Sequence, residues 1–85
     1  MRFYAMLFLV ALASPALASP QCTSEPKDKW LAKAVIQAKA EAMGNTIDIL
    51  KTTKGNCYEV YGRNAKGKRI EIYFNPVTGK PVQES

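Results

Sequence analysis

Apolar residues follow a helical spacing up to Gly44 and a strand-like alternation after it. Before Gly44 they recur at steps of three and four, which places them on one side of a helix. These residues are Trp30, Leu31, Ala34, Val35, Ala38, Ala42 and Met43. Gly44 followed by Asn45 is a typical helix stop, so we expect a helix that ends at Met43. Its start stays open between Asp28, which can cap a helix, and Leu31.

The second half of the chain alternates with a period of two, which is typical of strands. The alternation is visible at 46–49 and in two longer runs, 57–63 and 68–74, which flank a turn at 64–67. We expect a type I turn with Gly67 in the left-handed conformation, because glycine reaches positive φ without a Cβ clash.

This turn fixes the register of the two strands. With Asn64 opposite Lys68, all apolar residues fall on one face and the polar residues on the other. The apolar pairs are Tyr58–Phe74, Val60–Ile72 and Gly62–Ile70. The polar pairs are Glu59–Tyr73, Tyr61–Glu71 and Arg63–Arg69. A slip of one residue would mix the two sets, so the side-chain pattern and the turn support the same hairpin.

A further turn and a short edge strand complete the predicted fold. The segment 75–79, Asn-Pro-Val-Thr-Gly, is typical of a tight turn, in which Pro76 presets φ and Gly79 supplies a left-handed exit. Lys80 to Glu84 is predicted as a short edge strand. The expected fold class is α+β, with one N-terminal helix packed on an antiparallel sheet of three to four strands.

The start of the chain has the pattern of a secretory signal peptide. Arg2 is followed by an apolar run at 3–13 and by Ala16-Leu17-Ala18, whose small residues suit cleavage after Ala18. The run is shorter than the ~20 residues that span a bilayer, and no second long apolar stretch follows. We therefore expect a periplasmic or secreted protein without a membrane-spanning segment after cleavage. The predicted parts are a signal peptide at 1–18, an extended arm at 19–27 and one domain at 28–85.

The chain has two cysteines and no histidine. A thiol nucleophile without an imidazole partner lacks its usual base, and a zinc site needs three or four ligands, for which no cluster is visible. In an exported chain, an even cysteine count favours a disulfide. We therefore predict a Cys22–Cys57 bond that pins the arm to the start of the strand at 57–63. The bond would stabilise a domain that is too small to rely on its core alone.

No catalytic centre is visible in the rest of the chain. The serines after residue 18 lie in the arm or at the end of the chain, with no histidine to activate them. Glu59 and Glu71 are the one candidate carboxylate pair, but we expect both on an open, solvated face with ordinary pKa values. No glycine-rich phosphate loop occurs. We therefore predict a protein that is not an enzyme and that uses no metal and no cofactor.

Basic residues outnumber acidic ones by 12 to 7, and the lysines are scattered along the chain. Scattered lysines are typical of a solvated surface. No nucleic acid is expected as a partner, because no recognition motif is present. The polar hairpin face is the candidate binding surface, because tyrosine and arginine are enriched in recognition sites; the alternative is a solvated face whose charges discourage aggregation. Its residues are Glu59, Tyr61, Arg63, Arg69, Glu71 and Tyr73.

The run CYEVYGRNAKGKRIEIYFNPVTGK at 57–80 resembles the PepSY domain family, in particular its small exported members. The matching elements are the YEVYG strand, the glycine turn at Gly67, the strand at 69–74 and the NPVTG turn. Family members commonly have Asp where Asn75 stands, and we expect this departure to alter little, since Asn also favours turn starts.

The resemblance implies a non-catalytic binding or regulatory module. Its implied partner is a secreted or envelope peptidase, which it restrains, or another envelope protein. A cationic envelope protein that contacts anionic lipid or polymer surfaces is the alternative reading of the same chain.

Overall fold

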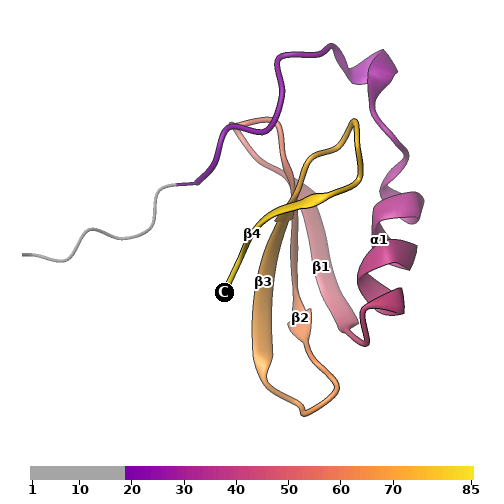
Figure 1. The fold of residues 1–85 in the computed structure, drawn as a ribbon, viewed down its shortest axis with the longest axis vertical. Helices are drawn as coiled ribbons and strands as arrows, with labels where there is room; N and C mark the ends of the chain where they lie inside the picture. Colours follow the sequence, from indigo (N-terminus) through magenta and orange to yellow (C-terminus); the bar gives the residue numbers. More distant parts are fainter. Residues whose placement is uncertain (1–18) are drawn as a thin grey trace, which may run out of the picture.

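The computed structural model describes residues 19–85, in which a helix and a four-stranded antiparallel sheet make up the fold (Figure 1). The elements are the short 3-10 helix η1 (Lys27–Lys29), the helix α1 (Lys33–Ala42) and the strands β1 (Thr46–Thr52), β2 (Tyr58–Arg63), β3 (Arg69–Phe74) and β4 (Pro81–Glu84). Neighbouring strands pair in chain order, β1-β2-β3-β4. This arrangement confirms the predicted α+β class. The predicted signal peptide at 1–18 lies outside the described residues.

α1 begins later than both starts that the sequence suggested. Trp30 has extended backbone angles (φ −85°, ψ 145°), and the N–H of Leu31 donates to the carbonyl of Pro76 at 2.8 Å. That bond ties the segment before the helix to the turn after β3, so α1 begins only after it. The other end agrees with the prediction, since Met43 is the C-cap and Gly44 follows at φ 95°. Within residues 19–85, neither helical segment has the length and apolar character that a bilayer crossing requires.

α1 buries a different face from the one that the apolar spacing predicted. Ile36 and Ala40 are fully buried, whereas Val35 and Met43 are 41% and 45% exposed. The three alanines of the predicted stripe are exposed as well. The prediction took its phase partly from Trp30, which packs on the core from an extended segment and not from the helix. The helix phase was therefore wrong although the helix itself was predicted.

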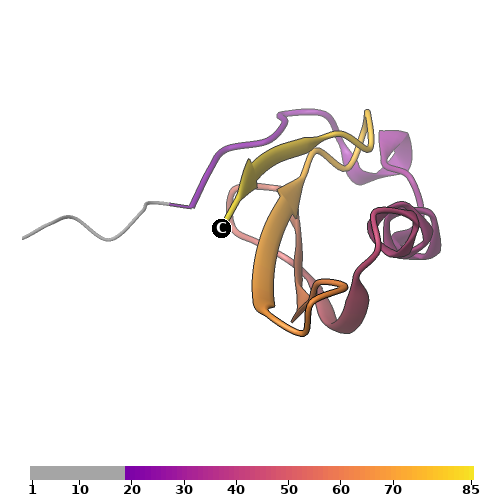
Figure 2. The same ribbon diagram turned by 60° about the horizontal axis from the view of Figure 1, so that its bottom comes forward.

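The hairpin β2–β3 has the predicted register, and its turn holds Gly67 at φ 82°. Its apolar side packs against α1. The buried core consists of Ile36, Ala40, Tyr58, Val60, Ile72 and Phe74. Trp30 packs edge-on against Tyr58 with ring centroids 5.4 Å apart, and the Tyr58 hydroxyl donates to the Leu31 carbonyl at 2.8 Å. Figure 2 shows α1 beside one face of the twisted sheet, which leaves the other face free of any helix.

A disulfide joins Cys22 to Cys57, as predicted, and fixes the arm against the start of β2. The Cys22 N–H also donates to the Gly55 carbonyl at 2.9 Å, and the Asn56 side chain donates to the Thr23 carbonyl at 3.2 Å. The arm therefore runs along one end of the sheet, held by both covalent and hydrogen bonds (Figure 1).

Asn75 uses both ends of its side-chain amide. Its Oδ1 accepts from the N–H groups of Val77 and Thr78 at 2.8 and 3.2 Å, and its Nδ2 donates to the Cys22 carbonyl at 3.0 Å. An aspartate accepts the same two bonds but has no N–H to donate. The amide therefore links the turn after β3 to the arm beside the disulfide, a contact that the sequence did not reveal.

Candidate functional site on the open face of the sheet

The sheet face that α1 leaves uncovered, called the open face below, carries the polar pairs predicted from the sequence. β2 and β3 place Glu59 opposite Tyr73, Tyr61 opposite Glu71 and Arg63 opposite Arg69. β1 adds Ile49 beside Tyr61 and Lys51 beside Glu59. The fold thus brings all the predicted site residues together and adds residues of β1 that the sequence analysis had left out.

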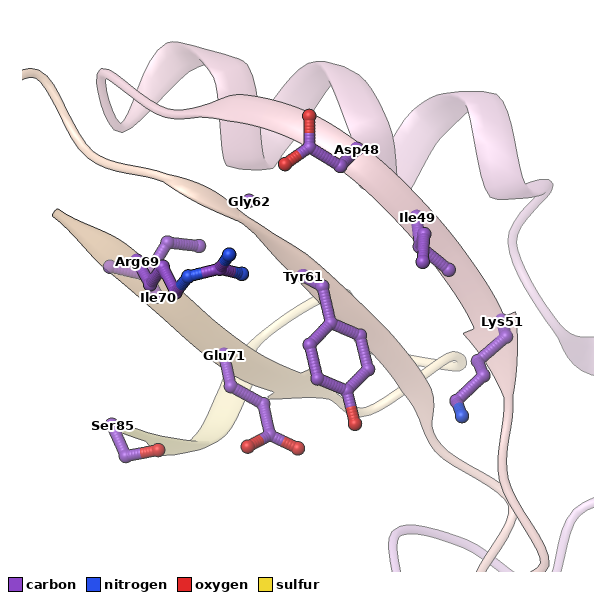
Figure 3. Close-up of a pocket in the computed structure, with 9 residues that line it drawn as sticks. All are labelled: Asp48, Ile49, Lys51, Tyr61, Gly62, Arg69, Ile70, Glu71 and Ser85. Carbon is purple, nitrogen blue, oxygen red and sulfur yellow. The ribbon is translucent and has the colours of Figure 1, made fainter. Parts of the chain in front are cut away.

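A trough of about 560 Å³ lies on the open face. It is lined by Asp48, Ile49, Lys51, Tyr61, Gly62, Arg69, Ile70, Glu71 and Ser85. Ile49 and Tyr61 give it exposed apolar surface, at 54% and 36% exposure. In Figure 3, the Tyr61 ring and the Glu71 carboxyl group project side by side, and the Arg69 guanidinium extends toward Tyr61. The trough therefore offers an aromatic ring, a cation and a carboxyl group within one hollow.

A β-bulge in β1 decides which of its residues reach the trough. The pairing with β2 shifts between Ile47 and Ile49, so Asp48 is an extra residue without a partner on β2. Because a bulge interrupts the alternation, Ile47 and Leu50 both pack on the core while Ile49 lines the trough. Simple alternation places Ile47 and Ile49 on one face, so the sequence alone does not assign Ile49 to the open face.

Glu59 and Glu71 are not the solvated carboxylates expected from the sequence. Glu59 is only 4% exposed, and Glu71 is half-buried. The Tyr73 hydroxyl donates to Glu71 Oε2 at 3.1 Å and lies 3.4 Å from the Ser19 hydroxyl. The arm therefore reaches one end of the open face, through a contact between residues that are far apart in the sequence.

The two carboxyl groups share a hydrogen bond that moves their pKa values in opposite directions. The bond with Glu59, together with burial, raises the pKa of Glu71. Burial also acts to raise the pKa of Glu59. Hydrogen bonds from Glu71 and from Tyr61 and Tyr73 outweigh this effect. The charge of Lys51, whose Nζ lies 4.0 Å from Glu59 Oε1, acts in the same direction, so the pKa of Glu59 is lowered. Glu71 therefore keeps a proton more readily than Glu59 does.

Glu59 and Glu71 also affect the nearby Tyr61. Its hydrogen bond to Glu59, followed by burial and the nearby negative charges, raises the pKa of Tyr61, so its hydroxyl stays protonated and remains a donor. The Lys51 Nζ lies 5.4 Å from the centroid of its ring, within the range of a cation–π contact. The exposed ring thus has the nearly buried Glu59 and the exposed Lys51 as neighbours.

The predicted binding residues divide into an exposed and a buried group. The exposed group is Tyr61, Arg63, Arg69 and, in part, Glu71. Glu59 and Tyr73, at 4% and 8% exposure, have almost no surface to offer a partner and serve as support. Binding by the exposed group stays a prediction. Among residues 19–85, no three cysteine or carboxylate side chains lie close enough together to hold a metal ion.

Comparison with known families gives one match. A PepSY family model, described as "Peptidase propeptide and YPEB domain", matches residues 2–85. The match covers nearly the whole chain, including the open face and both cysteines. No curated protein and no solved structure matches the chain.

Proposed function

Because the chain belongs to the peptidase propeptide and YPEB domain (PepSY) family, we propose that it is a non-catalytic regulatory module that restrains a peptidase in the periplasm or outside the cell. Its contact surface in this proposal is the trough around Tyr61 and Arg69. The observation that carries the proposal is the hollow itself, where exposed aromatic and apolar side chains lie beside an arginine on the only sheet face without a helix among residues 19–85.

The composition of the trough suits the binding of a protein segment. Tyrosine and arginine in partly enclosed positions are the residue types that most often dominate the energy of an interface. Ile49 beside Tyr61 gives a place for one apolar side chain of the partner. Arg69 supplies donors for a carboxylate or for backbone carbonyls of the same segment.

The rigidity of the site supports the proposal further. Tyr61 has Ile49 and Glu71 as its cross-strand partners, and the Lys51 Nζ lies 5.4 Å from the centroid of its ring. A side chain that is already fixed loses less conformational entropy when a partner binds, which increases affinity. The disulfide between Cys22 and Cys57 supports the proposed location, because such bonds persist in oxidising compartments.

The test uses the chain from Ser19 onward with a photo-crosslinker in place of Ile49, applied to the native envelope or culture medium. A captured peptidase is then purified and assayed with the unmodified chain. We expect the wild type to slow peptide cleavage. We expect Y61A/R69A to raise its inhibition constant by about 10-fold or more, as for a hot-spot truncation.

The matched control is Val35→Ala, which truncates an exposed apolar residue on α1. It should inhibit like the wild type. Equal inhibition by Y61A/R69A and the wild type would place the contact elsewhere. A crosslinked set without any peptidase would contradict the proposed function itself.

A further inference from the structure

Four cations lie within seven residues, 63–69, at the turn between β2 and β3. Arg63 and Arg69 face each other where the strands end, and Lys66 and Lys68 follow in the turn between them. All four are exposed. We propose that this group, called the basic tip below, docks on the surface of a lipid bilayer that carries anionic headgroups. The tip shares Arg69 with the trough, but its two lysines lie outside the trough, so they test this proposal separately from the peptidase contact.

The tip carries four positive charges and no acidic residue between 63 and 69. Eleven of the twelve basic residues and all seven acidic residues lie in the described part of the chain. When the four tip cations are set aside, the remaining seven basic residues match the seven acidic ones. The net positive charge of residues 19–85 is therefore equal to that of the tip alone. The ion pair found within 4 Å in this part of the chain, Lys51 with Glu59, does not involve the tip.

Hydrogen bonds hold the backbone of the tip in place. Asn64 Oδ1 accepts from the N–H groups of Lys66 and Lys68 at 2.9 and 3.0 Å. The Arg63 guanidinium donates to the Gly67 carbonyl at 3.3 Å. Like charges that face each other across a hairpin repel, and here the backbone keeps them together. An anionic surface relieves that repulsion on contact.

The shape of the tip favours a flat partner. In Figure 1 the turn between β2 and β3 is at the end of the molecule opposite to the arm. The trough ends at Arg69 and takes in none of the turn residues. The exposed large apolar residues of the described chain are Val35, Met43, Ile49, Tyr61 and Val82, none of which belongs to the tip. A projecting cluster of cations without an apolar anchor fits reversible electrostatic adsorption to headgroups.

The test compares binding of the chain from Ser19 onward to two kinds of vesicle, measured by co-sedimentation. One kind is neutral phosphatidylcholine, and the other contains about one-third phosphatidylglycerol. We expect binding only to the second kind, at low ionic strength, with progressive loss at about 0.1 M salt and above, where the Debye length falls to about 10 Å. Each basic residue near an anionic bilayer strengthens binding about 5-fold, so K66Q/K68Q should weaken vesicle binding about 25-fold.

The matched control is K29Q/K33Q, which removes the same charge from exposed lysines near the start of α1. It should weaken vesicle binding by less than about 5-fold, roughly what long-range charge alone contributes. Equal weakening by both double variants would mean that net charge and not the tip governs adsorption. Absence of binding to the anionic vesicles, or binding of an acidic peptide in their place, would overturn the proposal. Inhibition of the captured peptidase by K66Q/K68Q should stay at the wild-type level, so the two proposals fail separately.

Discussion

Loss of the disulfide should remove most of the stability of this domain. The bond joins residues 35 apart in the sequence. For a loop of that size the chain-entropy estimate is about 4 kcal/mol of unfolding free energy. Small domains often have only about 5 kcal/mol in total. Reduction should therefore leave the chain close to its unfolding midpoint at room temperature.

The assay is thermal unfolding followed by far-ultraviolet circular dichroism, with the oxidised chain, the reduced chain and the variant C22S/C57S. For a domain of this length, about 1 kcal/mol shifts the Tm by about 4–8 °C, so we expect the Tm to fall by about 15–30 °C on reduction. The Tm of C22S/C57S should be at least as low as that of the reduced chain. Cys57 is fully buried, and its replacement also removes the packing of its sulfur.

The comparison between the reduced wild type and the double variant separates the cross-link from the packing of sulfur. If the oxidised and reduced chains melt within about 3 °C of each other, the stabilisation by loop closure is refuted. Two free thiols in unreduced, denatured protein would show that the bond does not form at all.

Two further substitutions test the polar contacts. Glu71→Gln keeps a donor to Glu59 but removes the titrating proton. Because the folded-state pKa of Glu71 is raised above its ordinary value of 4.5, its stabilising effect is present below that value and is lost as pH rises through the folded-state pKa. Glu71→Gln should therefore gain about 1 kcal/mol in unfolding free energy over the wild type at neutral pH and little near pH 3; the same gain at both would contradict the shared proton. Asn75→Asp removes the donor to the Cys22 carbonyl and should cost about 1–2 kcal/mol in urea unfolding, whereas an unchanged midpoint would show that this bond adds no stability.

The hairpin was predictable because two independent signals constrained it. The turn ending at Gly67 fixes which residues pair, and the alternation of apolar and polar residues fixes which face each pair takes. The disulfide was predictable for a similar reason, since only one pairing of two cysteines exists. The phase of α1 had no such second constraint. Its apolar spacing continued into Trp30, whose extended backbone follows from a bond between Leu31 and Pro76 that the sequence does not reveal.

The burial of the candidate site residues could not be predicted from the spacing of apolar and polar residues within one strand. Glu59 is buried where its strand lies between Lys51 of β1 and Tyr73 of β3, and Ser19 of the arm contacts Tyr73 at that end of the face. The bulge at Asp48 moved Ile49 from the core face to the trough. Both effects arise from tertiary packing. Periodicity describes one element at a time. It placed the correct residues of β2 and β3 on the open face. It could not show that Glu59 would be buried there by neighbouring segments.

The order of the strands has a consequence for how the chain folds. Each strand pairs with the one that precedes it, so contacts within the sheet join segments that are close in sequence. Such topologies fold faster than those that require distant strands to meet. Since chains are synthesised from the N-terminus, α1 and β1 are available before β2 arrives, and each later strand finds an edge already formed. The partner of Cys22, Cys57, directly precedes β2, so the disulfide can form before β3 and β4 are synthesised. These two strands can then pair in order.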